Sequence, residues 1–560
     1  MRTLILLTAA YLALSGNNAL AQTCNGQAAT IIGTEDDDDI PGTPGDDIIV
    51  GLGGNDRITG LAGNDLICGD DGDDDLIGGD DDDQLFGGVG NDVLEGDDGI
   101  DACDGGTGVD SADEPCETVV NTDTVVFPAT VTATDGTPLA GALYMPTNDA
   151  LVGGEYRRVA IVVTHGAMGT YSASVPKIIG LQAAPLGFTV FAMDRRDAGP
   201  DGGGGAVLFE DATLDLGAGI DLLAALGYDL IYVAGHSQGT QNVCIYPSFS
   251  VDPRVAAVGQ YGTVDDGRAV AQDLLFNELA APVPYSDYVV LAEDLVDAGE
   301  GDIVRPWDTI FGVPVFRSPN NWLSFWGPDS LSVCVREVEK LLVPQLMLRA
   351  DGDEFTPDAM SQNVLASALD AGGDSVYTVL PYPFPLTANG GNAHGFVGVE
   401  RETIATTVDW LEDRVPEATE TTPDIRLPTD DGTGNNFRPL AYEGTALTMP
   451  SSQPELMLDG TGSQDIDGEI FSYSWVQLGG PPVVLDDPTS ATPMFANPGP
   501  TDELLFELTV TDDDGAADTV VFALEVVAGN VVSKLPGGST IGPGALLALL
   551  LIGCVRRRRV

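Results

Sequence analysis

The pattern of hydrophobic and polar positions divides the chain into three parts. From residue 33 to 113, single apolar residues recur every nine positions among glycines and aspartates. From 118 to 418, short and nearly continuous apolar runs alternate with longer mixed segments, as buried strands between helices do. From 437 onward, apolar and polar residues alternate in short stretches, as in strands that bury one face. The sequence therefore predicts three folded parts of different architecture.

The first part is a repeat of nine residues that begins at Gly33 with GTEDDDDIP, GTPGDDIIV and GLGGNDRIT. Position one is always glycine, which permits tight turns. Position eight is apolar in every copy: Ile40, Ile49, Ile58, Ile67, Leu76, Leu85, Leu94, Cys103 and Ala112. Position six is aspartate in every copy: Asp38, Asp47, Asp56, Asp65, Asp74, Asp83, Asp92, Asp101 and Asp110. A solvated acidic tail would have no such register, so we expect stacked turns around a thin apolar core.

The density of carboxylates in this repeat calls for a cation, because aspartates packed so closely repel one another. Calcium takes roughly six to eight oxygen ligands, which aspartates and turn carbonyls of neighbouring turns can supply. The pattern resembles the RTX calcium-binding nonapeptide repeat. That resemblance implies a β-roll over 24–117, with structural Ca²⁺ held by the nine position-six aspartates. The repeats would then serve export, folding or surface attachment.

The second part predicts a mostly parallel sheet covered by helices on both faces. Its apolar strands lie within 159–169, 188–199, 229–240, 255–262 and 344–357. The third of these strands runs into Gly235-His236-Ser237-Gln238-Gly239, and a helical pattern follows. Glycines on both sides permit the strained turn that holds a nucleophilic serine above a sheet.

Histidine is rare enough to narrow the choice of base. The chain has three, at His165, His236 and His394. His236 adjoins Ser237 and cannot face it, and His165 belongs to the loop after an earlier strand. His394 is therefore the predicted general base.

The order of serine, acidic loop and histidine after successive strands resembles the α/β-hydrolase family. In that family the acid lies in a loop of the form G-x-x-D-x-x-x-P. By that resemblance we choose Asp353, four residues before Pro357, although Ala350 stands in the glycine position, with Asp351 and Glu354 as competitors. The resemblance implies backbone N–H donors for the oxyanion at Gln238 and Ala167. It also implies a serine hydrolase of the esterase or lipase kind without a catalytic cofactor. Cleavage of peptide or other acyl bonds stays open.

Residues 263–340 interrupt the sheet pattern and resemble a cap over the active site. They contain three of the five tryptophans, Trp307, Trp322 and Trp326. These rings either line an acyl pocket or form the core of the cap, since aromatic residues dominate both settings.

The third part follows a linker at 419–436 that is rich in Thr, Pro, Asp and Gly. Its segments LDGTGSQDIDGEIFSYSW and FELTVTDDDG resemble an immunoglobulin-like β-sandwich of the PKD type, over 437–528. Such domains act as spacers or bind carbohydrate and cell surfaces. Asp465 and Asp467 are either turn residues or cation ligands.

The two ends of the chain indicate export. Residues 1–21 resemble a signal peptide, with Arg2, an apolar stretch and an Ala-x-Ala site. Residues 529–560 resemble a GlyGly-CTERM sorting tail of Gram-negative bacteria, which implies transient inner-membrane anchoring. The net charge of -64 argues against nucleic acid as a partner.

Export fits the seven cysteines. Cys24, Cys68, Cys103 and Cys116 allow three connectivities, of which we favour Cys24–Cys68 and Cys103–Cys116. Cys244 and Cys334 either pair or stay buried as thiols.

Two functions remain in view. The first is a secreted serine hydrolase that cleaves carboxylic esters, with the domain at 122–418 as the catalytic part. The alternative is a calcium-dependent surface adhesion protein whose hydrolase module is inactive. The intact serine, acid and histidine favour the first.

Overall fold

The computed structural model describes residues 22–527 apart from internal gaps, of which the longer are 148–155, 199–206, 383–390 and 429–435. The predicted signal peptide and the whole of the predicted sorting tail lie outside the described residues. The chain divides into two compact units, residues 1–125 and 126–560. Among the described residues, no helix combines the length and the apolar character needed to cross a membrane.

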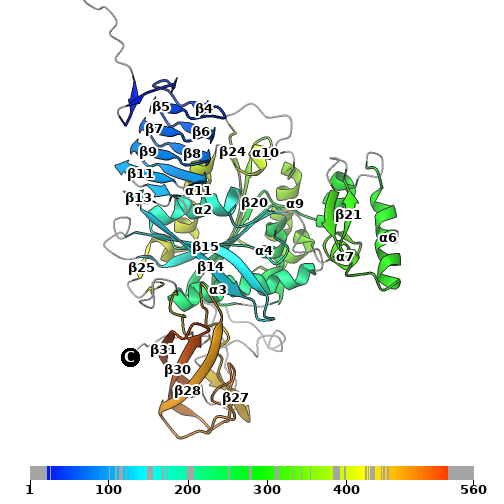
Figure 1. The fold of residues 1–560 in the computed structure, drawn as a ribbon. Helices are drawn as coiled ribbons and strands as arrows, with labels where there is room; N and C mark the ends of the chain where they lie inside the picture. Colours follow the sequence, from blue (N-terminus) through cyan, green and yellow to red (C-terminus); the bar gives the residue numbers. More distant parts are fainter. Residues whose placement is uncertain are drawn as a thin grey trace, which may run out of the picture. The chain divides into compact units, whose positions relative to one another are not determined.

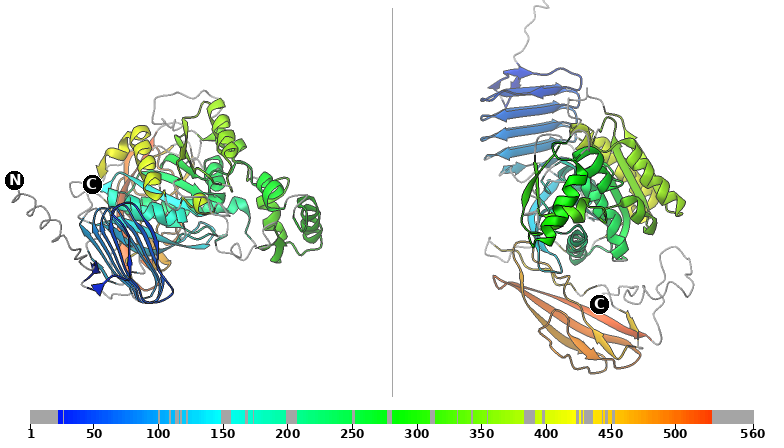
Figure 2. Two further views of the ribbon diagram at one scale, coloured as in Figure 1. Left: turned by 90° about the horizontal axis from the view of Figure 1, so that it is seen from above. Right: turned by 90° about the vertical axis from the view of Figure 1, so that its right-hand side faces the viewer.

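The first unit contains a stack of short parallel strands (Figures 1 and 2). One sheet is built from β4 (Asp39–Pro41), β6 (Arg57–Ala62), β8 (Asp75–Asp80), β10 (Val93–Asp98) and β12 (Ser111–Ala112). The other is built from β3 (Ile31–Ile32), β5 (Ile48–Gly53), β7 (Leu66–Asp71), β9 (Gln84–Val89), β11 (Ala102–Thr107) and β13 (Thr118–Val120). Ile58 lies opposite Leu76, so one coil takes two nonapeptides and each sheet repeats every 18 residues.

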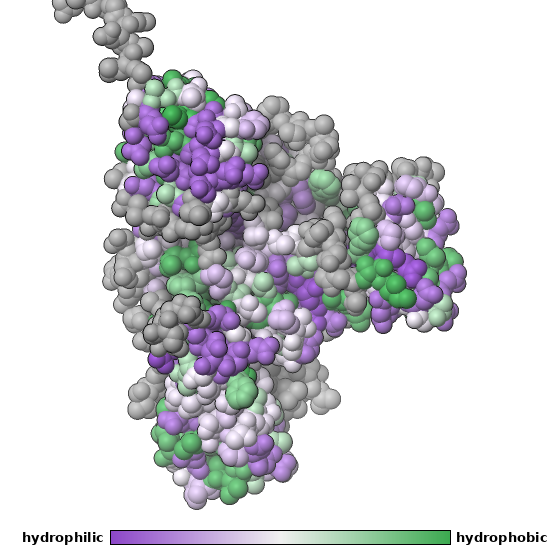
Figure 3. All heavy atoms as spheres, viewed as in Figure 1, coloured by the Kyte–Doolittle hydropathy of each residue, from purple (hydrophilic) through white to green (hydrophobic). Residues whose placement is uncertain are grey.

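The nine position-eight residues form one buried cluster between these two sheets, which confirms the predicted thin core. The position-five side chains Asp37, Asp46 and Asn64 are exposed. Accordingly, hydrophilic residues cover much of the repeat surface (Figure 3). Disulfides join Cys24 to Cys68 and Cys103 to Cys116, as favoured from the sequence. The repeat is therefore a β-roll with its own core and covalent closure.

An eight-stranded sheet forms the centre of the second unit. Its order is β14 (Thr124–Thr132), β15 (Pro138–Pro146), β18 (Val190–Met193), β17 (Val159–Thr164), β19 (Leu230–His236), β20 (Val255–Tyr261), β23 (Gln345–Ala350) and β24 (Ser375–Leu380). β15 pairs antiparallel with β18, and all pairs from β18 to β24 are parallel. This order, with the second strand reversed, is that of the α/β-hydrolase fold. The predicted strands are confirmed, and β14, β15 and β24 are additional.

Helices cover both faces of this sheet (Figure 2). α2 (Ser174–Ala183) packs against α11 (Glu400–Arg414). α3 (Ala212–Leu226) packs against α4 (Gln238–Phe249), and α9 (Asp358–Asp370) against α8 (Cys334–Glu337). The inner strands β17, β18, β19, β20 and β23 are buried along nearly their whole length, which is why their sequences read as continuous apolar runs.

The cap leaves the sheet after β20 and returns before β23. It contains α5 (Gly267–Ala269), a π-helical turn (Val270–Leu275), α6 (Tyr285–Asp297), the hairpin β21 (Arg305–Asp308) with β22 (Pro314–Arg317), and α7 (Pro319–Trp326). Trp307, Trp322 and Trp326 are buried against one another in the core of the cap. Of the two roles weighed for them, the structure therefore supports the structural one.

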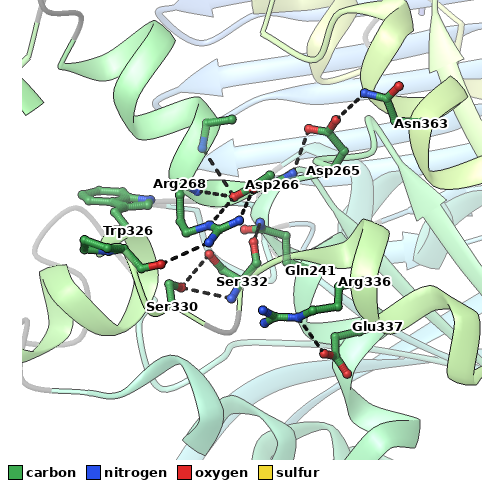
Figure 4. Close-up of polar contacts among 12 residues, drawn as sticks. Gln241, Asp265, Asp266, Arg268, Trp326, Ser330, Ser332, Arg336, Glu337 and Asn363 are labelled. Atoms are coloured by element: carbon green, nitrogen blue, oxygen red, sulfur yellow. Dashed lines mark hydrogen bonds and ion pairs between the residues drawn. The ribbon is translucent and has the colours of Figure 1, made fainter. Parts of the chain in front are cut away.

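The base of the cap is tied to α4, the helix that follows the predicted nucleophile. The Gln241 side chain donates to the Ser332 carbonyl at 2.6 Å (Figure 4). A disulfide joins Cys244 on α4 to Cys334 on α8. Asp265 accepts from Asn363 at 2.8 Å on the neighbouring helix α9 (Figure 4). The cap thus begins and ends on elements that also carry the predicted site.

The C-terminal part is a β-sandwich. One sheet has the order β26 (Thr448–Pro450), β31 (Ala517–Val527), β30 (Thr501–Asp512) and β28 (Ile470–Gly479), and the other pairs β27 (Glu455–Met457) with β29 (Met494–Ala496). Trp475 is buried in the core of the sandwich. The start of the predicted linker is not a free spacer, because β25 (Thr421–Thr422) pairs with β16 (Tyr156–Arg157).

Candidate active site

Ser237 occupies a sharp turn between β19 and α4. Its φ is +51°, in the left-handed region that a residue other than glycine adopts at a cost. Its N–H donates to the Tyr261 carbonyl at 2.8 Å, which fixes the turn to the end of β20. A Cβ on Gly239 would lie 2.7 Å from the His165 carbonyl oxygen, so this glycine is required by close packing. The strand–turn–helix context predicted for G-x-S-x-G is present.

His394 and Asp353 form a hydrogen-bonded pair. His394 Nδ1 lies 3.0 Å from Asp353 Oδ2 and 3.1 Å from Oδ1. The Asp353 carboxylate also accepts from the Thr356 N–H at 3.0 Å and from the Thr356 hydroxyl. Burial alone would raise the pKa of Asp353, but the hydrogen bonds from His394 and Thr356 outweigh it and lower the pKa. Asp353 therefore stays ionised and can orient an imidazole.

Asp351, one of the two alternatives for the acid, is exposed to solvent and pairs loosely with Arg349. The Asp351 side chain is 74% exposed and lies 4.0 Å from Arg349. Glu354 lies outside the described residues. Within the described loop, Asp353 is the carboxylate in contact with His394.

His236 connects this pair to the serine turn. Its Nε2 lies 2.8 Å from the His394 carbonyl oxygen, and the two rings are 4.7 Å apart. Burial, followed by the nearby His394, lowers the pKa of His236 to about 3. His236 is therefore neutral and donates Nε2–H to the carbonyl. Because His236 directly precedes Ser237, this bond holds the base loop beside the nucleophile.

One of the two predicted oxyanion donors, Gln238, lies at the same edge of the sheet. Gln238 is the first residue of α4, where backbone N–H groups have no partner within the helix. A Cβ on Gly166 would lie 2.9 Å from Ser237 Cβ and 3.5 Å from its Oγ, so the 165–166 turn adjoins the nucleophile. Ala167, the second predicted donor, lies outside the described residues.

A buried ionic cluster that the sequence reasoning missed supports this turn. Arg195 Nη1–H donates to the His165 carbonyl at 2.6 Å, and the Arg195 N–H donates to His165 Nε2 at 3.0 Å. Its guanidinium pairs with Asp197 at 2.8 Å. Burial would raise the pKa of Asp197, but the charge of Arg195 dominates and lowers it to about 2. The sequence signal was the pair of charged dipeptides Asp194-Arg195-Arg196-Asp197 directly after an apolar strand.

The repeat aspartates have the features of cation ligands. The Oδ1 atoms of Asp56 and Asp65 accept the N–H of the aspartate 18 residues earlier, at 2.8 and 2.7 Å. The Oδ2 atoms of Asp56, Asp65 and Asp83 are buried without a hydrogen-bond partner. Burial is the main cause that raises the pKa of Asp56 to about 6 and of Asp83 to about 7. Such oxygens are costly unless a cation or a donor meets them.

Backbone carbonyls converge on the same points. A Cβ on Gly51 would meet Asp56 Oδ2 and lie 2.7 Å from the Gly69 carbonyl oxygen, and Gly78 has the same surroundings. The described residues contain no group of three or more His, Cys, Asp or Glu side chains placed to hold a metal. The donor set is therefore one carboxylate with backbone carbonyls at each turn, which fits Ca²⁺.

The first two turns differ from the rest. Asp38 Oδ2 accepts from the Thr34 N–H and hydroxyl at 2.6 and 2.8 Å. Asp47 Oδ2 accepts from the Thr43 N–H and hydroxyl at 2.7 and 2.8 Å. The threonine at position two thus donates to the aspartate Oδ2 atom in these two turns, whereas Asp56 Oδ2 has no hydrogen-bond partner. The sequence predicts the same calcium-binding role for all nine aspartates. In the structure, Asp38 and Asp47 differ from Asp56, because their Oδ2 atoms already accept hydrogen bonds.

Comparisons with known proteins agree with the two outer parts. Residues 41–76 and 77–112 match the RTX calcium-binding nonapeptide repeat, and residues 444–526 match a family of PKD domains. A comparison with curated proteins gives no match.

Among solved structures, the chain is similar to the esterase Pf2001 of Pyrococcus furiosus at 13% identity and a TM-score of 0.34, covering 52% of this chain and 91% of that one. It is similar to the esterase domain of a Rhodothermus marinus protein at 18% identity and a TM-score of 0.33, covering 52% and 98%. It is also similar to Est1E of Butyrivibrio proteoclasticus at 16% identity and a TM-score of 0.35, covering 52% and 99%. From its own strand order and its matched segments, the chain combines RTX calcium-binding repeats, a domain of the α/β-hydrolase fold and a C-terminal PKD domain.

Proposed function

We propose that this protein is a secreted serine hydrolase that cleaves carboxylic ester bonds through an acyl-enzyme on Ser237. The observation that carries the proposal is the chain of contacts from Asp353 to His394 and from His394 to His236, the neighbour of Ser237. Ser237, Asp353 and His394 follow three different parallel strands, β19, β23 and β24, at the edge of the sheet where this fold places its reactive groups.

In the proposed mechanism, His394 Nε2 accepts the proton of the Ser237 hydroxyl as its Oγ attacks the ester carbonyl carbon. The ionised Asp353 holds the Nδ1–H tautomer of His394 and stabilises the imidazolium. The N–H groups of Gln238 and Ala167 stabilise the oxyanion. Collapse of this intermediate breaks the bond to the alcohol, which leaves with a proton from His394. Water then attacks the acyl-enzyme by the same steps and releases the acid.

Arg195 acts in this proposal as a positioning residue. It holds the His165 carbonyl and therefore the turn that leads to Ala167. Loss of an oxyanion donor typically costs about a hundredfold or more in rate, so the shape of this turn matters to the reaction.

The repeats supply structure in this proposal, and no step of the reaction passes through them. Asp56, Asp65 and Asp83 would hold Ca²⁺ with backbone carbonyls, and the cation would neutralise the stacked carboxylates. Three disulfides and the predicted signal peptide support an extracellular site of action.

The test is labelling by a fluorophosphonate probe of the purified full chain in calcium. Labelling of the wild type and of Ser474→Ala, an exposed serine in the sandwich, together with its loss in Ser237→Ala, is the expected result. Labelling that persists in Ser237→Ala would show that another residue is the nucleophile. An unlabelled wild type would favour the adhesion protein. If labelling depends on Ser237, a panel of esters and peptides decides which bond is cleaved.

A further inference from the structure

A cationic side chain of the cap lies buried against the loop that follows β18. Arg317, at the end of β22, has 2% of its side chain exposed, and its Nη2 lies 3.9 Å from Oδ2 of Asp197, which is 1% exposed. Burial lowers the pKa of Arg317 to about 10 against the opposing charge of Asp197, so the guanidinium is charged at neutral pH. Separating two charges in a low-dielectric interior is costly, so this pair fixes the cap to the loop.

The same carboxylate holds Arg195. Asp197 Oδ1 accepts from Arg195 Nε–H at 2.8 Å, and Oδ2 accepts from Arg195 Nη2–H at 3.2 Å. A further N–H of this guanidinium, on Nη1, donates to the His165 carbonyl at 2.6 Å. The cap guanidinium, the carboxylate, the second guanidinium and the turn beside Ser237 therefore form one chain of buried contacts.

The ring of His165 belongs to this chain and reports on the turn. Its Nε2 accepts the Arg195 N–H at 3.0 Å, so the proton of the neutral ring lies on Nδ1, which donates to the Gly166 carbonyl at 2.6 Å. Burial lowers the pKa of His165 to about 4, so the ring is neutral at neutral pH. In a planar trans peptide the carbonyl and the following N–H point in opposite directions. Holding the Gly166 carbonyl would therefore also direct the N–H that follows it, the predicted oxyanion donor.

The cap also holds the far end of this loop. The Asn321 side chain, on α7, accepts from Arg317 Nη1–H at 2.6 Å and donates to the Val207 carbonyl. The Phe209 N–H donates to Ser324 Oγ, also on α7, at 2.6 Å. One side of the cap, formed by β22 and α7, thus contacts the loop near both of its ends.

We propose that Arg317 is a positioning residue through which the cap sets the shape of the oxyanion turn, by way of Asp197 and Arg195. The inference rests on the proposed hydrolase function and adds that oxyanion stabilisation requires a correctly seated cap. Because the oxyanion forms only during the reaction, loss of this positioning lowers kcat and leaves KM nearly unchanged.

The test compares Arg317→Gln with Arg305→Gln in the full chain with calcium. Arg305 is the matched control, because it lies directly opposite Arg317 in the same hairpin but pairs with Glu300 of the cap at 2.8 Å and is 29% exposed. Arg317→Lys keeps the charge, so it separates the ion pair from the space that the side chain fills. Ester hydrolysis gives kcat and KM, with kcat expressed per site that a fluorophosphonate labels, so that unfolded protein is not counted.

A second readout is independent of activity. The chain has three histidines, so histidine labelled with nitrogen-15 in untagged protein gives ring signals from three residues. Those of His165 show the Nδ1–H tautomer and should shift in Arg317→Gln, because the turn is no longer held from the cap. Those of His236 should stay and verify that the serine turn is folded. Arg305→Gln should leave all three residues unchanged.

The expected result for Arg317→Gln is a fall in kcat of about tenfold, smaller than the roughly hundredfold cost of a lost oxyanion donor, with little change in KM. Arg317→Lys should recover most of kcat. Unshifted His165 signals in Arg317→Gln would overturn the proposal, as would an equal fall of kcat in Arg305→Gln. A raised KM at unchanged kcat would assign Arg317 to substrate binding and also overturn it. An inactive wild type would refute the proposed hydrolase, whereas the His165 signals would still decide whether the cap positions the turn.

Discussion

The hydrogen bonds around Ser237 require buried histidines that stay neutral. His236 donates to the His394 carbonyl only as an uncharged ring, and burial lowers its pKa to about 3. Between that pH and the ordinary histidine pKa, the unfolded chain binds a proton that the folded chain does not. The free energy of unfolding must therefore fall as the pH drops below about 6.5. His165, whose pKa burial lowers to about 4, adds to the same trend.

The substitution His236→Gln isolates this contribution, because glutamine keeps an N–H donor and does not titrate. We expect the loss of unfolding free energy on acidification to lessen by up to about 1.4 kcal/mol per pH unit. Urea unfolding at about pH 7 and about pH 5, in saturating calcium, measures the difference. An unchanged pH dependence would mean that His236 is already protonated in the folded protein.

A second prediction at the scale of single residues concerns Asp353. Asp353→Asn removes the carboxylate that selects the Nδ1–H tautomer of His394, so kcat should fall by about three to four orders of magnitude. Asp351→Asn, two residues away and exposed, is the matched control and should change the rate little. Comparable losses in both variants would place the acid elsewhere in the loop. Ester hydrolysis under saturating substrate provides the measurement.

The serine, acid and histidine could be proposed from the sequence because of their order along the chain, the scarcity of histidine and the resemblance of the acidic loop, and their roles remain a prediction. The sequence did not identify Arg195, since a charged residue after a strand is usually solvated and only the fold brings its side chain to the His165 carbonyl. It also did not separate Asp38 and Asp47 from the other repeat aspartates. Thr34 and Thr43 at position two distinguish these two repeats in the sequence. Only the structure shows that their hydroxyls donate to the aspartates at position six.

At the scale of elements, the turns of the β-roll should not bind calcium equally. Asp47 and Asp65 are successive aspartates on one side of the roll, and the Asp47 N–H donates to Asp65 Oδ1. Asp65→Asn should remove one calcium from the stoichiometry, since its unpartnered Oδ2 is lost. Asp47→Asn should leave the number unchanged, because Thr43 already satisfies that oxygen. Isothermal titration of the metal-stripped protein counts the ions, and equal losses would refute the distinction.

The elements of the central sheet were predictable because strands buried on both faces carry an unmistakable pattern. The arrangement of the cap was less predictable from the sequence. Its tryptophans have the same composition whether they face a ligand or one another, and only their mutual packing assigns them to the core of the cap. Apolar side chains of the cap are nevertheless exposed at Val290, Leu291 and Ile303, and Figure 3 shows apolar surface on this lobe.

For the whole molecule, the division at residue 125 means that one unit can lose its structure without the other. The β-roll has its own core and depends on its carboxylates being neutralised. The hydrolase domain has a separate core and the disulfide between Cys244 and Cys334.

We therefore expect a chelator to unfold the roll and to leave most of the probe labelling at Ser237. Limited proteolysis locates the unfolded segment, and labelling is measured on the same sample. Replacement of the chelator by its calcium complex is the control. Complete loss of labelling in a chain whose residues 126–527 resist proteolysis would show that the repeats contribute to the active site.

The ladder of aspartates in the roll has a direction. The backbone N–H groups of seven position-six aspartates, from Asp38 to Asp92, each donate to the aspartate carboxylate that lies 18 residues later in the chain. The last N–H, at Asp110, donates at 3.0 Å to Asp123, which lies beyond the final nonapeptide. A coil emerging from a ribosome or a pore with its N-terminus first thus has no acceptors until the following coil arrives. The acceptor for the last of these N–H groups is present only when Asp123 is available, so we expect assembly to proceed from the C-terminal coil back toward the N-terminus.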